Sequence, residues 1–424
     1  MKKATVLWLL IVLMSLSTQA QQQTIVSGRV LSGTTGKAIP GASVSGGGQS
    51  VVTNDDGYFL LKSNAQLTSI SVSHVGYRSE HIREKSGKWK AEGLHIRLQP
   101  TTIQLNEVLI VAGGDPRTLV EEAIRKIPQN YSQQPELYRC FYRETAMKRQ
   151  RHIMVAEGVV DMYKTSYNHG VWRDRVAIRK GRRLLSPRSG DTLGIKVLGG
   201  PVVPVQLDVV KNPDFLLNEV ELDCYAMKME PPTTIDDRRH FVVSISPSRQ
   251  MPYALYYGRL YIDQETLAFS RIELNLDVSD REKASALMLI KKPAGVRFRP
   301  KELSLVIDYR PENGMMHIRY VRATFRFNCD WKKRLFATSF MACCEMVVTS
   351  REENGADKPL RGHDTFDQRD AFYDKVDFFL DTAFWQDYNI IEPTESLDRA
   401  IGKLLKMKRY PPPAPPRGNE GEEE

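Results

Sequence analysis

Residues 27–61 read SGRVLSGTTGKAIPGASVSGGGQSVVTNDDGYFLL. Short apolar runs alternate here with turns rich in glycine, and the same pattern continues on both sides of the stretch. Short strands at this spacing, separated by turn signals, are typical of a β-sandwich. The clearest predicted strands are residues 25–30, 42–44, 58–61, 70–72 and 94–98.

Several elements of this region follow one another in the order found in a known domain family. They are Gly28-x-Val30, Gly36-x-x-Ile39-Pro40-Gly41-Ala42-x-Val44, Thr53-x-Asp55-x-Gly57-x-Phe59, Ser73-x-Val75-Gly76-Tyr77 and the closing LNEVLIVAGG of residues 105–114. The region resembles the carboxypeptidase-regulatory-like, or transthyretin-like, domain, in the form found at the N-termini of outer-membrane transporters and other envelope proteins of Bacteroidetes. The resemblance implies a seven-stranded sandwich over residues 23–112, with another envelope protein as a partner of this domain.

Residues 54–56, Asn-Asp-Asp, place three side-chain oxygens just before Gly57 and could belong to a calcium loop or to a turn. An EF-hand loop needs oxygen ligands at positions one, three and five and a glutamate at position twelve. Counting from Asp55 puts Gly57, Phe59 and Gln66 at positions three, five and twelve, and counting from residue 54 also fails. Asn and Asp tolerate left-handed backbone geometry and glycine supplies a positive φ. The sequence therefore predicts a tight turn without calcium.

No motif carries a recognisable catalytic or metal site. The segment His81-Ile-Arg-Glu84 matches the His-x-x-Glu metal pair of zinc carboxypeptidases, but it lies inside the regulatory-like domain and has no recognisable third ligand, whereas a catalytic zinc needs three. The sequence has no HExxH motif, nucleophile elbow or phosphate-binding loop. The acidic pairs Asp236-Asp237 and Glu352-Glu353 are interpreted as surface charge. We predict no catalytic residue, metal or cofactor and no enzymatic activity, and a hydrolase is the least favoured alternative.

The first twenty residues have the features of an export signal. Lys2 and Lys3 precede an apolar run at residues 4–16, and residues 18–20 provide a small-residue cleavage site. The apolar run is shorter than the roughly 20 residues that cross a bilayer, and no cysteine follows the cleavage site to accept a lipid. We expect an exported protein, in the periplasm or on the periplasmic face of the outer membrane.

Removal of that signal leaves 58 basic and 51 acidic residues, a net charge of +7. In an exported protein, a positive excess favours anionic lipid or acidic glycan as a partner over nucleic acid. One basic segment is a candidate contact for such an anionic surface, and a solvated charged loop is the alternative. The segment comprises Trp172, Arg173, Arg175, Arg179, Lys180, Arg182, Arg183 and Arg188.

The five cysteines form no CxxC pair and no cluster with metal-ligand spacing, although an exported protein can form disulfides. Some of them are interpreted as small buried hydrophobic residues. Adjacent residues of a strand point to opposite faces, so Cys343 and Cys344 cannot enter the same core. The other three are Cys140, Cys224 and Cys329.

Residues 115–409 are predicted to form a second, larger domain. Asp115 and Pro116 suit the start of a short helix that ends before Pro128, and residues 263–266 suit a hairpin turn. Alternating apolar residues predict a curved antiparallel sheet over residues 137–350, which loosely resembles the half-barrels of periplasmic lipoprotein carriers. The predicted strands are residues 141–144, 155–160, 241–245, 259–262, 270–276, 303–307, 318–327 and 340–348.

The C-terminal part is predicted to be helical before a disordered tail. Thr394 can cap a helix whose Leu397, Ile401 and Leu404 face inward, and the proline-rich, acidic residues 410–424 are expected to be disordered. We expect the terminal helices to cover the concave face of the sheet, above either an apolar cleft or a fully packed core. The aromatic residues of the covering segment are Phe378, Phe379, Phe384 and Trp385.

The predicted fold class is mainly β, with an N-terminal sandwich followed by an α+β domain that has a curved antiparallel sheet and flanking helices. This arrangement, with the segments LYRCFYRET and FWQDYNIIEP, resembles uncharacterised Bacteroidetes envelope proteins. We predict a non-enzymatic binding or scaffolding protein of the periplasm or outer membrane. The alternative is a small outer-membrane β-barrel or a membrane-docked envelope component, although arginines occur on both faces of the candidate strands. The sequence does not indicate the ligand, the partner or the oligomeric state.

Overall fold

The computed structural model describes residues 23–85, 89, 93–101, 115–188, 191, 196–197, 199–331, 336–352, 360, 365–367, 370–378, 385 and 388–409. The predicted export signal, the closing motif at 105–114 and the predicted disordered tail at 410–424 lie outside these residues, as do Phe379 and Phe384. Among the described helices, none combines the length and apolar composition needed to span a bilayer.

The N-terminal region is a sandwich of two small sheets around one apolar core, which confirms the seven-stranded prediction. The first sheet has the order β4-β1-β7 and the second the order β3-β2-β5-β6. Alternate residues of each strand, such as Val30, Val44, Phe59 and Ile70, point into the space between the sheets. The strands are β1 (Thr24–Ser32), β2 (Ser43–Gly46), β3 (Gln49–Val52), β4 (Tyr58–Ser63), β5 (Ser69–Ser73), β6 (Glu80–Arg83) and β7 (Leu94–Leu98).

Residues 54–57 form the predicted tight turn. The Oδ1 atom of Asn54 accepts hydrogen bonds from the amides of Asp56 and Tyr58, at 3.0 and 2.9 Å. Gly57 has a φ of +81°, and a Cβ at this position would lie 2.6 Å from the carbonyl oxygen of Val30. Glycine is therefore required both by the backbone conformation and by the close approach of β1.

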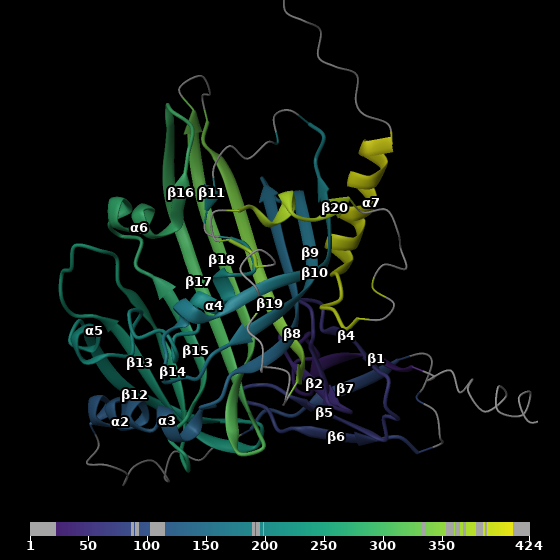
Figure 1. Cartoon of the computed structure of the whole chain (residues 1–424), viewed down its shortest axis with the longest axis vertical. Coiled ribbons are helices and arrows are strands. Elements are labelled where there is room, and N and C mark those ends of the chain that lie inside the picture. The colour runs from purple at the N-terminus through teal and green to yellow at the C-terminus, as the bar shows by residue number, and fades with distance from the viewer. Residues whose placement is uncertain are drawn as a thin grey trace, which may run out of the picture.

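One large sheet dominates the second domain (Figure 1). Its strand order is β12-β13-β14-β15-β17-β18-β19-β8-β9-β10-β20, and every neighbouring pair is antiparallel except β10 and β20. Each strand predicted from the sequence for this domain is present. The strands are β8 (Glu136–Lys148), β9 (Arg151–Lys164), β10 (Arg175–Leu185), β12 (Tyr225–Ile235), β13 (Arg238–Pro247), β14 (Tyr256–Asp263), β15 (Phe269–Leu276), β17 (Val296–Glu312), β18 (Met315–Trp331), β19 (Thr338–Glu352) and β20 (Asp377–Phe378).

Around β8, β9 and β19 the sheet buries both of its faces, and alternate residues of these strands contact different parts of the protein. We call the face that carries the main apolar core the core face, and the opposite face, which meets the N-terminal sandwich, the docking face. On β19, Cys344 and Met346 lie in the main core, whereas Val347 packs with Val52 of the sandwich. Two covered faces explain why Cys343 and Cys344 are both buried although they point in opposite directions.

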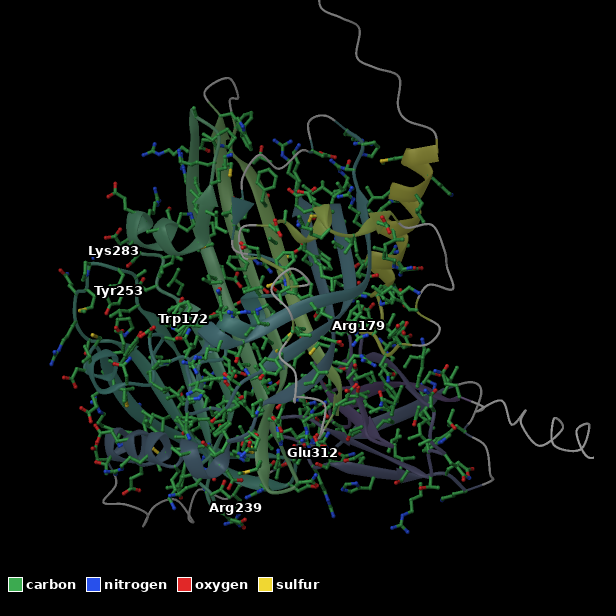
Figure 2. All side chains as sticks on the ribbon, viewed as in Figure 1. Trp172, Arg179, Arg239, Tyr253, Lys283 and Glu312 are labelled. Atoms are coloured by element: carbon green, nitrogen blue, oxygen red, sulfur yellow. The ribbon has the colours of Figure 1, made fainter. Side chains whose placement is uncertain are left out.

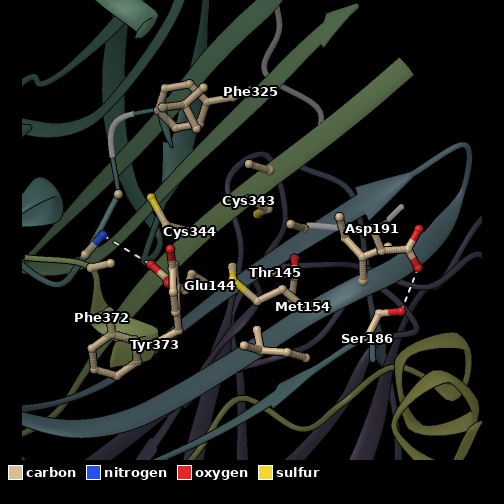
Figure 3. Close-up of a pocket in the computed structure, with 18 of the residues that line it drawn as sticks. Glu144, Thr145, Met154, Ser186, Asp191, Phe325, Cys343, Cys344, Phe372 and Tyr373 are labelled. Carbon is tan, nitrogen blue, oxygen red and sulfur yellow. Dashed lines mark hydrogen bonds between the residues drawn. The ribbon is translucent and has the colours of Figure 1, made fainter. Parts of the chain in front are cut away.

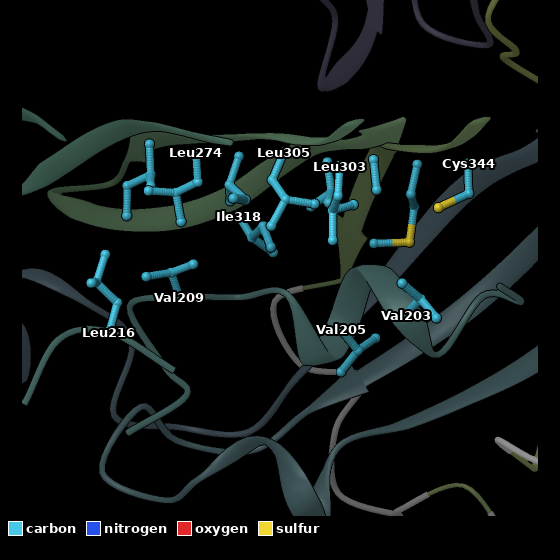
Figure 4. Close-up of a cluster of buried hydrophobic side chains, with 14 of the residues drawn as sticks. Val203, Val205, Val209, Leu216, Leu274, Leu303, Leu305, Ile318 and Cys344 are labelled. Carbon is cyan, nitrogen blue, oxygen red and sulfur yellow. The ribbon is translucent and has the colours of Figure 1, made fainter. Parts of the chain in front are cut away.

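The core face is covered chiefly by residues 199–224, which contain the short helices α4 (Val203–Gln206) and α5 (Glu219–Leu222). In Figure 4, Leu274, Leu305 and Ile318 of the sheet point toward Val203 and Val209 of this covering segment. The helices α2 (Pro116–Arg125), α3 (Ile127–Asn130) and α6 (Arg281–Met288) flank the same core, and β11 (Lys196–Val197) pairs with β16 (Leu289–Lys291). The predicted cap of α2 is confirmed, because the side chain of Asp115 accepts the amides of residues 117 and 118.

The C-terminal helix α7 (Glu395–Arg409) packs on the large sheet. Its Leu397 and Leu404 are buried as expected, and they pack on Val155 and Leu184 of β9 and β10, on the docking face. Trp385 also lies on this face, against Phe141. α7 therefore covers part of the docking face, whereas the covering segment at 199–224 occupies the core face.

The sandwich is fastened to the docking face by polar contacts around Val52. Arg322 of β18 makes a bidentate ion pair with Asp55, with distances of 2.7 and 3.1 Å. Asp56 accepts the amide of Glu395, at the start of α7, at 2.8 Å. The carbonyl of Tyr388 accepts a hydrogen bond of 3.0 Å from the ammonium group of Lys62. The two acidic residues of the turn thus join the domains.

Candidate functional site

A cavity of about 420 Å³ lies on the core face, beside the start of the covering segment, whose Gly199 and Gly200 belong to its lining (Figure 3). Ligand pockets typically enclose about 300–1,000 Å³, so this cavity is large enough for a small molecule or one apolar chain. Its apolar lining includes Ala146, Ile153, Met154, Leu185, Val197, Phe325, Ala342, Cys344, Ala371 and Phe372.

The strands β8, β9, β18 and β19 form the wall of the cavity through residues that share the core face. Ala146, Ala342 and Phe325 are direct neighbours across three of these strands. The two alanines leave space that larger side chains would fill. Phe372, in the 3-10 turn at residues 372–374, lines one side of the cavity and packs against β9, where a Cβ at Gly158 would lie 2.8 Å from its ring.

One end of the cavity carries Asp191, whose negative charge is balanced by neighbouring basic side chains. Arg151 binds this carboxylate with two hydrogen bonds of 2.7 Å, Lys148 lies 3.1 Å away, and the hydroxyl of Ser186 donates at 2.6 Å. Burial alone would raise the pKa of Asp191, but these donors hold the pKa below its usual value. Asp191 is therefore a fixed anion within a positive environment and cannot serve as a proton donor near neutral pH.

The opposite side of the cavity carries Glu144, whose carboxylate accepts hydrogen bonds from the Tyr142 hydroxyl at 3.0 Å and the Gly200 amide at 3.2 Å (Figure 3). Two thiols lie nearby. Burial raises the pKa of Cys343 to about 11 and that of Cys344 well above its usual value. A thiolate is the reactive form of cysteine, so neither thiol is activated as a nucleophile. The described lining has the character of a binding cavity with polar ends.

A cluster of four buried charged residues holds the covering segment on the core face. Lys164 binds Asp208 at 2.7 Å, and Lys211 binds Asp174 at 2.6 Å. Asp208 also accepts the hydroxyl of Tyr309 at 2.8 Å. All four charged side chains are at most 1% exposed, so two cations and two anions neutralise each other inside the core. Burial, with Lys164 close by, lowers the pKa of Lys211 to about 8.

The predicted anionic-contact segment does not form one continuous surface. Trp172 and Arg179 lie far apart in Figure 2, and Trp172 is 63% exposed. On the docking face, Arg182 pairs with Glu157 at 3.1 Å and lies over the ring of Trp385. Arg183 points to the other face, where it donates to the carbonyl of residue 373.

The remaining members of that segment differ in their surroundings. Arg179 pairs with Asp161, Arg175 donates to the carbonyls of residues 172 and 174, and Lys180 lies near the ring of Tyr388. Arg173 and Arg188 are exposed. Contact of the basic segment with an anionic surface stays a prediction. The residues of the segment most available for such contact are Trp172, Arg173, Arg175 and Arg188, which are all exposed.

The segment at residues 81–84 is split by the end of a strand. His81 lies on β6 and Glu84 follows the end of that strand. Among the residues that the structure describes, no group of three or more His, Cys, Asp or Glu side chains is placed to hold a metal ion.

Sequence reasoning missed the cavity lining and the buried charge cluster. The lining residues come from strands that are distant in sequence, so no local pattern marks them. The cluster did leave a signal, because Asp208 and Lys211 interrupt the otherwise apolar run PVVPVQLDVV at residues 201–210 and its continuation. Charged residues within an apolar run are buried only when they are paired.

Comparison with known proteins identifies the first domain. Residues 26–110 match the family model described as the CarboxypepD_reg-like domain. The comparison with curated proteins found no match.

Solved structures similar to part of the chain differ from it strongly in sequence. They include a DUF1329 family protein from Desulfovibrio piger, with 8% identity, a TM-score of 0.24 and coverage of 59% of this chain and 98% of that one. A domain named as an outer membrane lipoprotein-sorting protein, from Vibrio parahaemolyticus, has 10% identity, a TM-score of 0.23 and coverages of 58% and 94%. MucB, solved in complex with MucA(peri), has 11% identity, a TM-score of 0.17 and coverages of 58% and 97%.

TM-scores this low do not establish a shared fold or function for the second domain. The family match covers only the N-terminal part of the chain, but it agrees with the resemblance seen in the sequence and with the seven strands of the structure. The N-terminal sandwich is thus similar to the CarboxypepD_reg-like domain in both sequence and strand content.

Proposed function

We propose that this protein is a non-enzymatic binding protein of the bacterial envelope that holds an apolar or amphipathic ligand in the cavity on the core face. The observation that carries the proposal is the cavity itself, which has an apolar wall from four strands and fixed polar groups at its ends. Pockets of this composition bind ligands through apolar contact and use a few polar groups for orientation.

The chemistry of the lining supports binding in preference to catalysis. Catalytic sites place acids, bases or nucleophiles with pKa values near the working pH. Here the pKa of Asp191 is lowered, and burial raises the pKa values of the Cys343 and Cys344 thiols. Export to the periplasm or the outer membrane, in a member of the Bacteroidetes, is part of the proposal and rests on the predicted signal and the family of the first domain.

The ligand is proposed to be a single-chain amphiphile. Its apolar chain would lie along Ile153, Phe325 and Ala342, and a polar end would meet Lys291 or the compensated group around Asp191, which line the same cavity. A second role, a scaffold that binds another envelope protein through its sandwich, is compatible with ligand binding because the sandwich lies on the opposite face of the sheet.

Uptake of a fluorescent single-chain probe tests the proposal. Delipidated full-length mature protein should bind dansylaminoundecanoic acid saturably, with one probe per chain. Ala342→Phe places a ring in the cavity and should weaken binding by about tenfold or more, equivalent to about 1.4 kcal/mol. Ala286→Phe, on the exposed side of α6, adds the same ring elsewhere and should leave binding unchanged.

Two results would contradict the proposal. One is the absence of saturable uptake by protein with a native circular dichroism spectrum and a cooperative unfolding transition. The other is equal weakening by both variants, since that would indicate adsorption at the surface. Either result would leave the second domain as a scaffold.

A further inference from the structure

A second hollow, of about 620 Å³, lies between the sandwich and the second domain. One wall is the outer face of the sheet β3-β2-β5-β6, and the other is formed by the tips of β17 and β18 and the end of β19. Glu312, labelled in Figure 2, lies on the second wall. We call this hollow the interdomain groove.

The sandwich wall of the groove is a row of hydroxyl groups. Ser50, Ser45, Ser71 and His81 are direct neighbours on four adjacent strands, because the registers pair Ser50 with Ser45, Ser45 with Ser71, and Ser71 with His81. Direct partners on antiparallel strands point to the same face. This row therefore offers three hydroxyl groups and an imidazole side by side, and the Oγ atom of Ser50 has no hydrogen-bond partner among the described residues.

The groove also has an excess of positive charge. Its lining includes four arginines, Arg83, Arg310, Arg319 and Arg351, and one carboxylate, Glu312. Arg351 is compensated, since it pairs with Glu312 at 3.1 Å and with Glu136 outside the groove at 3.1 Å. Within the part of the chain that the structure describes, Arg310 has one ion-pair contact, with Asp236 at 4.0 Å.

Arg83 and Arg319 have no carboxylate within ion-pair distance among the described residues. Arg319 is the more unusual of the two, because its Nε atom is buried without a hydrogen-bond partner. Its Nη2 atom donates to the carbonyl of Val51 at 3.3 Å. Burial, with Arg310 nearby, lowers the pKa of Arg319 to about 9. The carboxylates of Asp236 and Asp308 offset this effect only in part, from beyond ion-pair distance, so an anion in the groove would stabilise the charge of Arg319 further.

We propose that the interdomain groove binds an oxyanion carried by a small hydroxylated molecule, such as a phosphorylated or carboxylated sugar. Arg83 from the sandwich and Arg319 from the large sheet hold the anion from opposite walls. The serine row accepts and donates hydrogen bonds to the hydroxyl groups of the ligand. Guanidinium groups suit phosphate and carboxylate because they offer several donors in one plane.

The composition of the groove favours such a ligand over an apolar one. Hydroxyl, amide and guanidinium groups from Ser45, Gln49, Ser71 and Arg83 dominate the sandwich wall, and they would lose their hydrogen bonds to water beneath an apolar group. The site is also distinct from the proposed cavity for an apolar chain, because it lies on the docking side of the sheet. If the groove binds no such ligand, the proposal that the cavity binds an apolar chain is unaffected.

Isothermal titration calorimetry at low ionic strength tests the inference with four probes: glucose 6-phosphate, glucuronate, inorganic phosphate and glucose. Saturable binding of either charged sugar supports the proposal and identifies phosphate or carboxylate as the anion. Glucose should not bind, because it lacks the charge, and inorganic phosphate should bind more weakly than glucose 6-phosphate because it cannot reach the serine row. Binding should weaken as salt is added.

Matched variants locate the site. Arg83→Gln should weaken binding of the charged sugar by about tenfold, and Arg83 is exposed, so the fold is not at risk. Arg97→Gln, an exposed arginine on β7 of the other sandwich sheet, makes the same change in charge and should have no effect. Arg319→Gln should weaken binding as well, and its unfolding curve shows whether the fold is preserved.

The proposal is wrong if neither charged sugar binds, or if Arg83→Gln and Arg97→Gln weaken binding equally, since the latter would indicate a general effect of net charge. It is also wrong if inorganic phosphate binds as tightly as glucose 6-phosphate, because the serine row would then contribute nothing.

Discussion

Replacement of Asp208 by asparagine tests whether the buried charge cluster holds the covering segment on the core face. Asp208 belongs to that segment, and Lys164 belongs to the end of β9. The new side chain has nearly the same shape, so packing is preserved. The change removes one negative charge from a cluster of two lysines and two aspartates.

The size of the effect follows from burial. In the variant, two ammonium groups share the single carboxylate of Asp174, which lies 3.4 Å from Lys164 and 2.6 Å from Lys211. Loss of one partner of a buried ion pair costs about 3–5 kcal/mol. Asp208 accepts the hydroxyls of Tyr167 at 2.9 Å and Tyr309 at 2.8 Å. Asparagine keeps one acceptor oxygen, so one of these two hydroxyls can still donate to it. We expect the free energy of unfolding to fall by about 4 kcal/mol, a large part of the roughly 5–15 kcal/mol of a typical domain.

Urea titration followed by circular dichroism gives the change in the free energy of unfolding, provided that the slope with urea is unchanged. Asp214→Asn is the matched control, because Asp214 is an exposed residue of the same covering segment. That variant should remain within about 0.5 kcal/mol of the parent. The parent and both variants should be compared at the same pH and ionic strength.

A double variant separates charge imbalance from other causes. Lys164→Met combined with Asp208→Asn leaves Lys211 paired with Asp174 and restores a neutral cluster. The double variant should therefore lose less stability than the sum of the single variants, by about 3 kcal/mol or more. Additive losses, or a loss below about 1 kcal/mol for Asp208→Asn alone, would refute the reasoning that these charges fasten the segment.

Further predictions concern the sandwich and its contact with the sheet. Burial lowers the pKa of His74 from 6.5 to about 4, so between these values the unfolded chain binds a proton that the folded chain does not, and stability falls as the pH falls. Urea titrations at pH 7 and pH 4.5 should show a smaller difference for His74→Gln than for the parent. Val52→Asp buries an unpaired carboxylate between the domains, and calorimetry should show the sandwich unfolding before the large sheet instead of with it. Gly57→Ala forces a side chain into a positive-φ position 2.6 Å from the Val30 carbonyl and should cost about 1–3 kcal/mol in urea titration. Calcium or a chelator should not change the melting temperature, because the side chains of residues 54–56 already have protein partners; a rise of several degrees with calcium would contradict the turn assignment.

The strands were predictable because their information is local. Alternation with a period of two marks a strand with one face in a core, as in Ile272, Leu274 and Leu276, which are all buried. The turn at residues 54–57 and the cap at Asp115 were predictable for the same reason, since each depends on the chemistry of a few adjacent residues.

The covering segment and the position of α7 were not predictable from the same signals. Residues 199–224 have neither a strand period nor a long helical period, and their burial depends on a sheet built from distant parts of the chain. The apolar stripe of α7 was read correctly, but a stripe does not specify which of two available faces it will cover. The interdomain groove needs Arg83 and Arg319, which are brought together only by docking of the domains.

Strand β8 explains how one sheet serves two purposes. Phe141 and Arg143 point to the docking face, where Phe141 meets Trp385 and Arg143 donates to the carbonyl of Ile391 at 2.7 Å. Tyr142 and Glu144, each one residue further along, point to the core face and to the cavity. A shift of the register by one residue would exchange these two sets, burying Arg143 in the apolar core and removing the anchor of the C-terminal segment. The buried pair of Arg143 with Glu157, at 2.6 Å, therefore holds the cavity wall and the docking of the sandwich in the same register.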